Sequence, residues 1–346
     1  MTNIDNLVAR ARIVRAIRSF FDGRGFVEVE TAVRIAAPAP EEHIDCPPCR
    51  DGGYLRASPE LQMKKLLAAG LDKIYQIGPC FREGERGSRH NPEFTMIEWY
   101  RRDATYRDIA EDLKELLKDE LSTVFSAENR DPRMETRSSS QISAPSDDSV
   151  LRAKTTLASS NNSTIRQFDC SNISSLPVRD AYLRFAGWDP WAGEWDQDRF
   201  DFDMATKVEP AIKEMGGGVF LVDYPPQAAS LAKISAGGGT LTLPPVGRGA
   251  PRPPTLPVAE RWEFYWDGME LANCFTELCD AGEQRRRFAA AKANRAALGE
   301  SDYPLDEEFL SSLPRIGSAA GVALGVDRLV MVLTGAKTIS DVRAAT

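Results

Sequence analysis

The sequence predicts an α+β fold in which an antiparallel sheet is flanked by helices. An apolar run ends at Arg82, and a polar, glycine-containing loop leads from it to the alternating run 93–100. This arrangement is typical of two antiparallel strands. Residues 260–278 contain a second pair of strand-like runs around Asp267-Gly268, which is a strong hairpin signal. Segments with helical spacing stand before and after these strands.

The bulk properties favour an enzyme-sized protein without a membrane span. The chain has 346 residues, enough for one large domain or for a core with an added lobe. Its net charge of −8 is unusual for a nucleic-acid binder, although a local basic groove remains compatible with it. No apolar run approaches membrane-spanning length. Six cysteines without a signal peptide indicate reduced thiols in a cytoplasmic protein.

The first third of the chain alternates between helices and strands. Apolar residues at helical spacing predict an amphipathic helix over 7–21, and glycines end it. Residues 26–31 alternate as a strand. Residues 54–69 indicate a strand that passes into a helix at Ser58-Pro59-Glu60, where proline suits the first turn. A further helix is expected over 106–121.

Two later segments lack the apolar residues of a core. Residues 122–177 are rich in Ser and Thr, and such a composition buries too little surface to offset the entropy of ordering. We expect a disordered insertion or a loosely attached loop there, with order resuming at Val178. Residues 219–235 indicate a buried strand and a turn, and 236–257 form a Gly/Pro-rich loop. The chain is therefore expected to be one catalytic domain, residues 1–346, with these two segments inserted.

The loop after Arg82 is suited to a nucleotide triphosphate. Arg82 offers a bidentate fork for an α-phosphate, and Arg86, Arg89 and His90 can reach the outer phosphates. Phe94 supplies a flat face for a purine, where stacking is worth roughly 1–3 kcal/mol. The alternative is an ordinary hairpin with a charged turn.

The strand after this loop has two different faces. Alternation places Phe94, Met96, Glu98 and Tyr100 on one face, and the residues between them on the other. Aromatic side chains and a carboxylate on the same face indicate a pocket.

The Asp267-Gly268 hairpin brings two carboxylates together. Tyr265 should pair with Glu270 across the turn, which places Glu263 and Glu270 on one face. Their repulsion is relieved by a cation, and Mg²⁺ prefers oxygen ligands. The alternative is a solvated strand face.

The same register sends the next polar residues to the opposite face. Asn273, Phe275 and Glu277 can join Glu263 and Glu270 in one pocket only if a β-bulge lies between Glu270 and Asn273.

The last informative segment is 321–335. Its small residues allow close backbone approach, a helix is expected to begin near Val326 or Asp327, and Gly335 ends it. Arg328 then lies in the first helical turn, where it can reach a γ-phosphate.

Residues 76–100 resemble motif 2 of class II aminoacyl-tRNA synthetases, and 321–335 resemble motif 3. The stretch HNPEFTM is typical of the lysyl branch. The resemblance is closest to the paralogues of lysyl-tRNA synthetase that attach β-lysine to elongation factor P. PELQMKKLLAAG, RHNPEFTMIEWYR, ELANCFTEL and GVALGVDRLVM are similar to the signatures of that family.

This resemblance implies a class II catalytic core with an antiparallel sheet of six or seven strands. It also implies a homodimer built on the first helix and residues 26–31. Only a few residues precede the first helix, so we expect no anticodon-binding domain and no anticodon recognition.

The resemblance implies a role for each matching residue. Arg82 and Arg328 would be catalytic, and Glu263 and Glu270 would bind magnesium. Those expected to bind ATP are Arg82, Glu85, His90, Asn91, Phe94, Glu263, Glu270 and Arg328. Those expected to bind the amino acid are Glu60, Glu98, Tyr100, Asn273, Phe275, Glu277 and Ala323.

The implied activity uses ATP and Mg²⁺ to activate (R)-β-lysine as an aminoacyl-adenylate. The aminoacyl group then passes to a lysine side chain of elongation factor P in the cytoplasm. Two alternatives remain open. One is a free-standing lysyl-tRNA synthetase-like adenylating enzyme with another acceptor, such as tRNA. The other is a catalytically silent regulatory paralogue.

Four positions bear on how closely the family pattern is followed. Gly84 stands where the family often has glutamate, and Glu85 is expected to substitute for it. Cys274 replaces a glycine and is expected to crowd the pocket floor, while Ala32 replaces a proline of the dimer motif. Ala323 agrees with the β-lysine ligases, whereas lysyl-tRNA synthetases have glycine.

Overall fold

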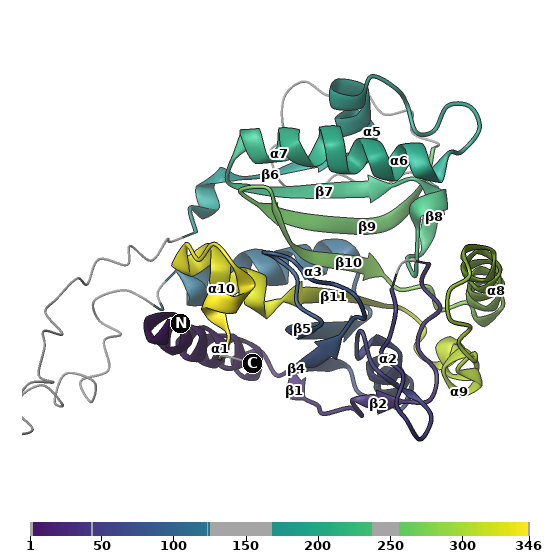
Figure 1. Ribbon diagram of the computed structural model, residues 1–346, viewed down its shortest axis with the longest axis horizontal. Helices are drawn as coiled ribbons and strands as arrows, with labels where there is room; N and C mark the ends of the chain where they lie inside the picture. Colours follow the sequence, from purple (N-terminus) through teal and green to yellow (C-terminus); the bar gives the residue numbers. More distant parts are fainter. Residues whose placement is uncertain (1–2, 43, 123, 125–167, 237–255, 345–346) are drawn as a thin grey trace, which may run out of the picture.

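A mixed sheet of nine strands organises the part of the chain that the computed structural model describes, which is residues 3–42, 44–122, 124, 168–236 and 256–344. The strands follow the order β1-β4-β5-β11-β10-β9-β7-β6, and β8 pairs with β9 (Figure 1). A separate two-stranded sheet joins β2 to β3. The strands are β1 (Val27–Glu28), β2 (Arg34–Ile35), β3 (Tyr54–Leu55), β4 (Lys73–Phe81), β5 (Glu93–Arg102), β6 (Ile173–Pro177), β7 (Gly218–Tyr224), β8 (Ile234–Ala236), β9 (Pro257–Trp266), β10 (Met269–Thr276) and β11 (Ala319–Gly325).

Helices surround this sheet. They are α1 (Ile4–Gly23), α2 (Glu60–Ala68), α3 (Tyr106–Glu115), α5 (Val178–Ala181), α6 (Gln197–Asp203), α7 (Glu209–Met215), α8 (Ala281–Leu298), α9 (Glu307–Ser312) and α10 (Val326–Thr334). A π-helical turn, Leu116–Leu121, continues α3. Among the described helices, none combines the length and the apolar character needed to cross a membrane.

The α+β class and a largely antiparallel sheet are confirmed, but the predicted number of strands is wrong and two strand pairs are parallel. The sheet has nine strands, and β1 pairs with β4, and β6 with β7, in parallel. Parallel neighbours need a long crossover connection. Helix α2 lies in the connection from β1 to β4, and α5, α6 and α7 lie in the connection from β6 to β7. The predicted strand 26–31 is limited to Val27–Glu28.

The boundaries of the two predicted inserted segments need correction. Phe168 is buried in the main core, and β6 forms five residue pairs with β7, so order resumes before Val178. The prediction relied on the average composition of 122–177, which is rich in Ser and Thr, and it therefore overlooked these few apolar residues. The Gly/Pro-rich loop is also shorter than predicted, because Ala236 pairs with Pro257. The remainders, 125–167 and 237–255, lie outside the described residues.

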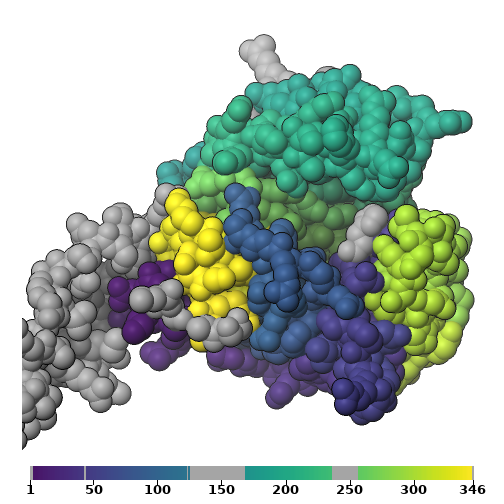
Figure 2. Space-filling view, viewed as in Figure 1, coloured from purple at the N-terminus to yellow at the C-terminus, as the bar shows by residue number. Residues whose placement is uncertain are grey.

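Three large clusters of buried side chains hold the described elements in place, and one of them packs α2, α8 and α9 together. The main core joins α1, α3 and α10 to the central strands, with Ile17, Trp99 and Trp262 fully buried. A second core lies beneath α5, α6 and α7, which cover β7 and its neighbours. Residues 168–236 form the upper part of the molecule in the space-filling view (Figure 2). The lower part carries the strands that line the cavity described next.

Candidate active site

Strand β5 has the two faces that its sequence predicts. Ile97 and Trp99 are fully buried in the main core, whereas Phe94, Met96 and Tyr100 line a cavity of about 190 Å³. Strand β11 lies beside β5, with Gly321 opposite Tyr100. A Cβ atom at Gly321 would lie 2.1 Å from the Tyr100 ring, so this close approach of the ring to the backbone requires glycine.

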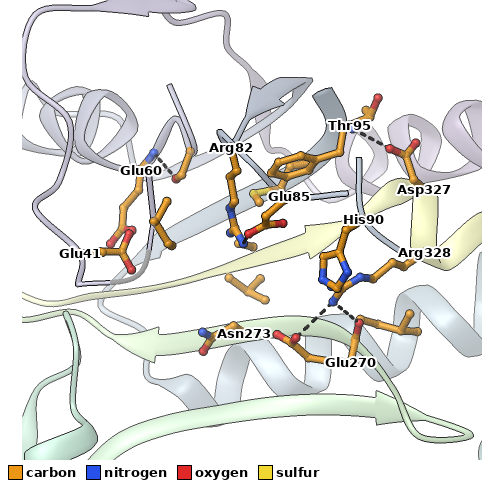
Figure 3. A pocket seen from close by; sticks show the side chains of 18 of the residues that line it. Glu41, Glu60, Arg82, Glu85, His90, Thr95, Glu270, Asn273, Asp327 and Arg328 are labelled. Atoms are coloured by element: carbon orange, nitrogen blue, oxygen red, sulfur yellow. Dashed lines mark hydrogen bonds and ion pairs between the residues drawn. The ribbon is translucent and has the colours of Figure 1, made fainter. Parts of the chain in front are cut away.

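The cavity brings together most of the residues that the sequence singles out (Figure 3). Three of them do not line it: Arg86 is absent from its wall, Glu98 is buried behind Tyr100, and Glu263 lines a neighbouring cavity of about 720 Å³. The predicted residues on the wall are Glu60, Arg82, Glu85, Arg89, His90, Asn91, Phe94, Tyr100, Glu270, Asn273, Phe275, Glu277, Ala323 and Arg328.

Arg82 occupies the middle of the cavity in Figure 3. Its Nη1 donates to Glu85 Oε1 at 3.3 Å, and its guanidinium carbon lies 5.3 Å from the centre of the Phe94 ring. Its Nε is buried without a hydrogen-bond partner among the described residues. Gly84 has φ +76°, a conformation that glycine adopts without strain, and Glu85 follows at the wall. The Nε–H of Arg82 can therefore donate a hydrogen bond to a bound anion.

The β9–β10 hairpin confirms the predicted turn and contains the bulge that a shared pocket would require. Asp267 and Gly268 both have positive φ, and Tyr265 pairs with Glu270. The register then shifts between Glu270 and Ala272. Because of this one-residue bulge, Glu270 lines the same cavity as Asn273, Phe275 and Glu277.

Glu263 and Glu270 interact electrostatically. Glu263 accepts hydrogen bonds from Arg261 Nη2 at 2.5 Å and from the Tyr265 hydroxyl at 2.7 Å. Burial and the negative charge of Glu263 raise the pKa of Glu270. A divalent cation beside them would relieve both effects.

The arrangement fits magnesium better than a metal held by protein alone. No group of three or more His, Cys, Asp or Glu side chains within the described ranges could hold a metal ion. Mg²⁺ commonly takes one or two protein carboxylates and completes its shell with phosphate oxygens and water.

Helix α10 anchors one end of the cavity. The buried Asp327 accepts from the Thr95 backbone N–H at 2.9 Å and forms ion pairs with Arg10 and Arg343. This network fixes the first turn, from which Arg328 extends. Arg328 Nη1 donates to the Glu270 carbonyl at 2.9 Å and lies 3.2 Å from its carboxylate.

His90 also contacts Arg328. Arg328 Nη2 lies 2.7 Å from His90 Nε2 (Figure 3). Burial and the Arg328 charge lower the pKa of His90, so we assign a neutral ring whose Nε2 accepts. Arg328 and His90 thus form a polar end suited to phosphate oxygens.

The opposite end of the cavity is rich in carboxylates. Lys64, which is buried, forms ion pairs with both Glu60 and Glu277. Burial is the main cause that raises the pKa of Glu277 to about 8. Glu277 is 3% exposed, and its Oε1 has no hydrogen-bond partner within the part of the chain that is described. This oxygen is positioned to accept from an ammonium group.

Glu98 supports the wall from behind. It accepts hydrogen bonds from Ser58 at 2.6 Å and from the Tyr100 hydroxyl at 2.8 Å. Burial and the charge of Glu60 raise the pKa of Glu98 to about 7.

Sequence reasoning missed several residues here. Lys64 follows Glu60 by one helical turn, a spacing that could have indicated the pair. Arg261 contacts Asn273 at 3.3 Å and Glu263, but nothing in its local pattern indicates it. The same holds for Glu41, which lies between short strands.

The expectation that Cys274 crowds the pocket floor is wrong. Cys274 is fully buried in the main core and does not line the cavity. It alternates with Asn273 and Phe275 along β10, so its side chain lies on the other face of the strand.

Known proteins match the chain over nearly its whole length. The family described as "tRNA synthetases class II (D, K and N)" matches residues 2–345. The elongation factor P–(R)-β-lysine ligase of Proteus mirabilis is 36% identical over 377 residues, which cover 99% of this chain and 95% of that protein. The ligase of the same name from Photorhabdus laumondii is 34% identical and covers 99% and 94%. That from Salmonella gallinarum is 35% identical and covers 99% and 95%.

Proposed function

Since the chain belongs to the elongation factor P–(R)-β-lysine ligases and to the class II tRNA synthetases, we propose that it activates (R)-β-lysine with ATP and transfers it to a lysine side chain of elongation factor P. One observation carries the proposal beyond family membership. The cavity has cationic and neutral donors at one end and an excess of carboxylates at the other, with Arg82 between them.

The donor end suits the triphosphate of ATP. Arg328 and His90 would contact the outer phosphates, and Asn91 and Glu85, which line the same cavity, would also contact ATP. Phe94 would stack on adenine. Arg82 would bind the α-phosphate and the substrate carboxyl, since its Nε is a buried donor without a partner among the described residues.

The carboxylate end suits a diamino acid. Two ammonium groups need carboxylates at two depths, and Glu60 and Glu277 stand on either side of Lys64. Each charge-assisted contact is worth about 1.5–3 kcal/mol. Asn273, Phe275 and Tyr100 complete the wall, and Glu98 orients Tyr100 through its hydrogen bond.

The first step forms the adenylate. A carboxylate oxygen of the amino acid attacks the α-phosphorus of ATP, the bond to the β-phosphate oxygen breaks, and pyrophosphate leaves. Arg82 and Arg328 would hold the reacting groups in line and meet the negative charge that develops on the phosphate oxygens. Glu263 and Glu270 would hold Mg²⁺, which supplies positive charge to the phosphates when it is bound.

The second step transfers the aminoacyl group. The neutral ε-amine of the acceptor lysine attacks the carbonyl carbon of the adenylate, the bond to the phosphate oxygen breaks, and AMP leaves. The amine loses a proton as the amide forms. ATP and elongation factors occur in the cytoplasm, so the proposed reaction belongs there, and it involves no anticodon.

Substrate choice is proposed to depend on Ala323. Its methyl group is at the cavity wall, opposite Glu98 on β5 and Asn273 on β10. This methyl would disfavour an amine on the carbon next to the carboxyl, and leaves room for an amine one carbon further. One methyl-sized difference in a tight pocket discriminates by roughly 10–200-fold.

ATP–pyrophosphate exchange tests the proposed activation. We expect exchange with (R)-β-lysine above that with α-lysine, and a loss of about 10²–10³-fold in rate in Arg82→Ala. Arg34→Ala is the matched control, because Arg34 is exposed and pairs with Asp51 away from the cavity.

Two results would contradict the proposal. Normal exchange in Arg82→Ala would show that the site lies elsewhere. Transfer of radiolabelled amino acid to tRNA, with none to elongation factor P, would identify a different acceptor.

A further inference from the structure

Glu41 lies in the segment between β2 and β3, outside the stretches in which the family motifs are found. Its side chain lines the 190 Å³ cavity and also the larger cavity beside it. In Figure 3, Glu41 is beside Glu60, and Arg82 lies between this pair and the end formed by His90 and Arg328. Glu41 therefore faces the region where the amino acid would bind.

The Glu41 carboxylate is available for a ligand. Among the described residues it makes no hydrogen bond and no ion pair, and the charges near it act only at longer range. Burial and the negative charge of Glu60 raise its pKa, whereas Arg82, Arg261 and Lys64 act in the opposite direction. A cation between Glu41 and Glu60 would relieve their repulsion and replace the lost hydration.

The backbone of this segment is fixed by a buried arginine. Arg295 of α8 is 1% exposed, and it donates to the Glu41 carbonyl at 2.7 Å and to Asp45 Oδ1 at 2.6 Å. The Tyr303 hydroxyl accepts from the Cys46 N–H at 2.9 Å. These contacts anchor the chain at Glu41, Asp45 and Cys46, and so fix the backbone from which the Glu41 side chain extends.

The same segment is tied to the residue that follows Arg82. The Glu83 N–H donates to the Asp45 carbonyl at 2.8 Å. Glu41 is thus held close to the arginine that would bind the substrate carboxyl. Glu277, which directly follows β10, is paired with Lys64 and lines the cavity, and its Oε1 has no hydrogen-bond partner among the described residues.

We propose that Glu41 is a further specificity-determining residue, which together with Glu60 binds the amino group nearer to the reacting carboxyl. Glu277 then binds the terminal ammonium group. This inference rests on the proposed function and deepens it. Arg295 acts through Glu41 and is a positioning residue.

The test compares two ligands that differ only in that amino group. (R)-β-lysine carries it, whereas 6-aminohexanoate has the same chain, carboxyl and terminal amine without it. In Glu41→Gln we expect the KM for (R)-β-lysine in pyrophosphate exchange to rise about 10–100-fold. The inhibition constant of 6-aminohexanoate and the KM for ATP should stay within about threefold of the unmodified values.

Glu42→Gln is the matched control. Glu42 is adjacent in sequence, accepts from the Asn294 side chain at 2.5 Å, and does not line the smaller cavity. The KM for (R)-β-lysine and the inhibition constant of 6-aminohexanoate should both be unchanged in Glu42→Gln. Arg295→Lys keeps the charge but loses the forked donors, and it should raise the KM for (R)-β-lysine without changing the KM for ATP.

The outcomes separate this inference from the proposed function. Glu41 does not bind that amino group if Glu41→Gln leaves the KM for (R)-β-lysine and the inhibition constant of 6-aminohexanoate unchanged. The same holds if the variant raises both constants by the same factor. If the unmodified protein exchanges pyrophosphate with no lysine isomer, the proposed function itself is wrong. A normal melting temperature for each variant shows that the comparison concerns folded protein.

Discussion

Buried carboxylates at the amine end favour substrate binding and lower the stability of the free protein. Glu98 is 1% exposed, and its pKa is raised to about 7 from 4.5. Between these two pH values the folded protein binds more protons at Glu98 than the unfolded chain does. The free energy of unfolding therefore falls as pH rises through this window, by on the order of 3 kcal/mol.

The Glu98→Gln variant tests this effect. An amide cannot ionise and can still bond to Ser58 and Tyr100. Without ligands, we expect its melting temperature relative to the unmodified protein to increase from pH 5 to pH 8. Glu93→Gln is the control, since Glu93 is on the same strand and exposed. A difference that stays constant with pH would show that Glu98 is ionised throughout.

Turns, strand faces and helix ends could be predicted where a short local sequence pattern alone determines the backbone geometry. The turn at Asp267-Gly268 requires positive φ, and strand alternation then fixes which residues face each other. The sequence indicated the bulge after Glu270 only as a condition for five residues to share one pocket; the bulge is present, but Glu263 lines the neighbouring cavity. The start of α10 near Val326 and its end at Gly335 were also confirmed.

Other elements depend on distant partners and could not be predicted in this way. Strand β6 is short, and its surroundings are rich in Ser and Thr, so only its pairing with β7 reveals it. Glu41 has no periodic neighbours, and its place depends on Arg295, which is far along the chain. Lys64 was missed because its burial depends on two carboxylates from different elements.

The segment 125–167 is expected to be dispensable for adenylate formation. The residues that flank it, Val124 and Phe168, are both buried in the main core, so the sheet retains its contacts on each side. Replacing 125–167 by a Gly/Ser bridge should preserve pyrophosphate exchange. A deletion that also removes Ile173–Pro177 should lower the melting temperature, because β7 loses its parallel partner. Loss of exchange in the first, folded variant would contradict this expectation.

The whole molecule is expected to be a homodimer that uses α1 and β1. This expectation comes from the family resemblance, in which the first helix and the following strand form the interface. Strand β1 is at one edge of the sheet, and Ile4 and Val27 are 72% and 49% exposed. Sedimentation equilibrium should give twice the mass of the chain. A monomer at all concentrations would rule out the dimer and would agree with the substitution of Ala32 for the usual proline.

The separation of charge along the cavity implies that the two substrates affect each other's affinity. The carboxyl groups of Glu41, Glu60, Glu98 and Glu277 lie at one end, where Lys64, Arg56 and Arg261 offset part of their charge. The field of the negative charge that remains opposes the approach of a polyanionic nucleotide at the other end. A diammonium ligand neutralises the field. ATP should then bind more tightly, and thermodynamic linkage requires ATP to tighten the diamino acid by the same factor. Because the effect is electrostatic, added salt should weaken this cooperativity before it weakens either substrate alone.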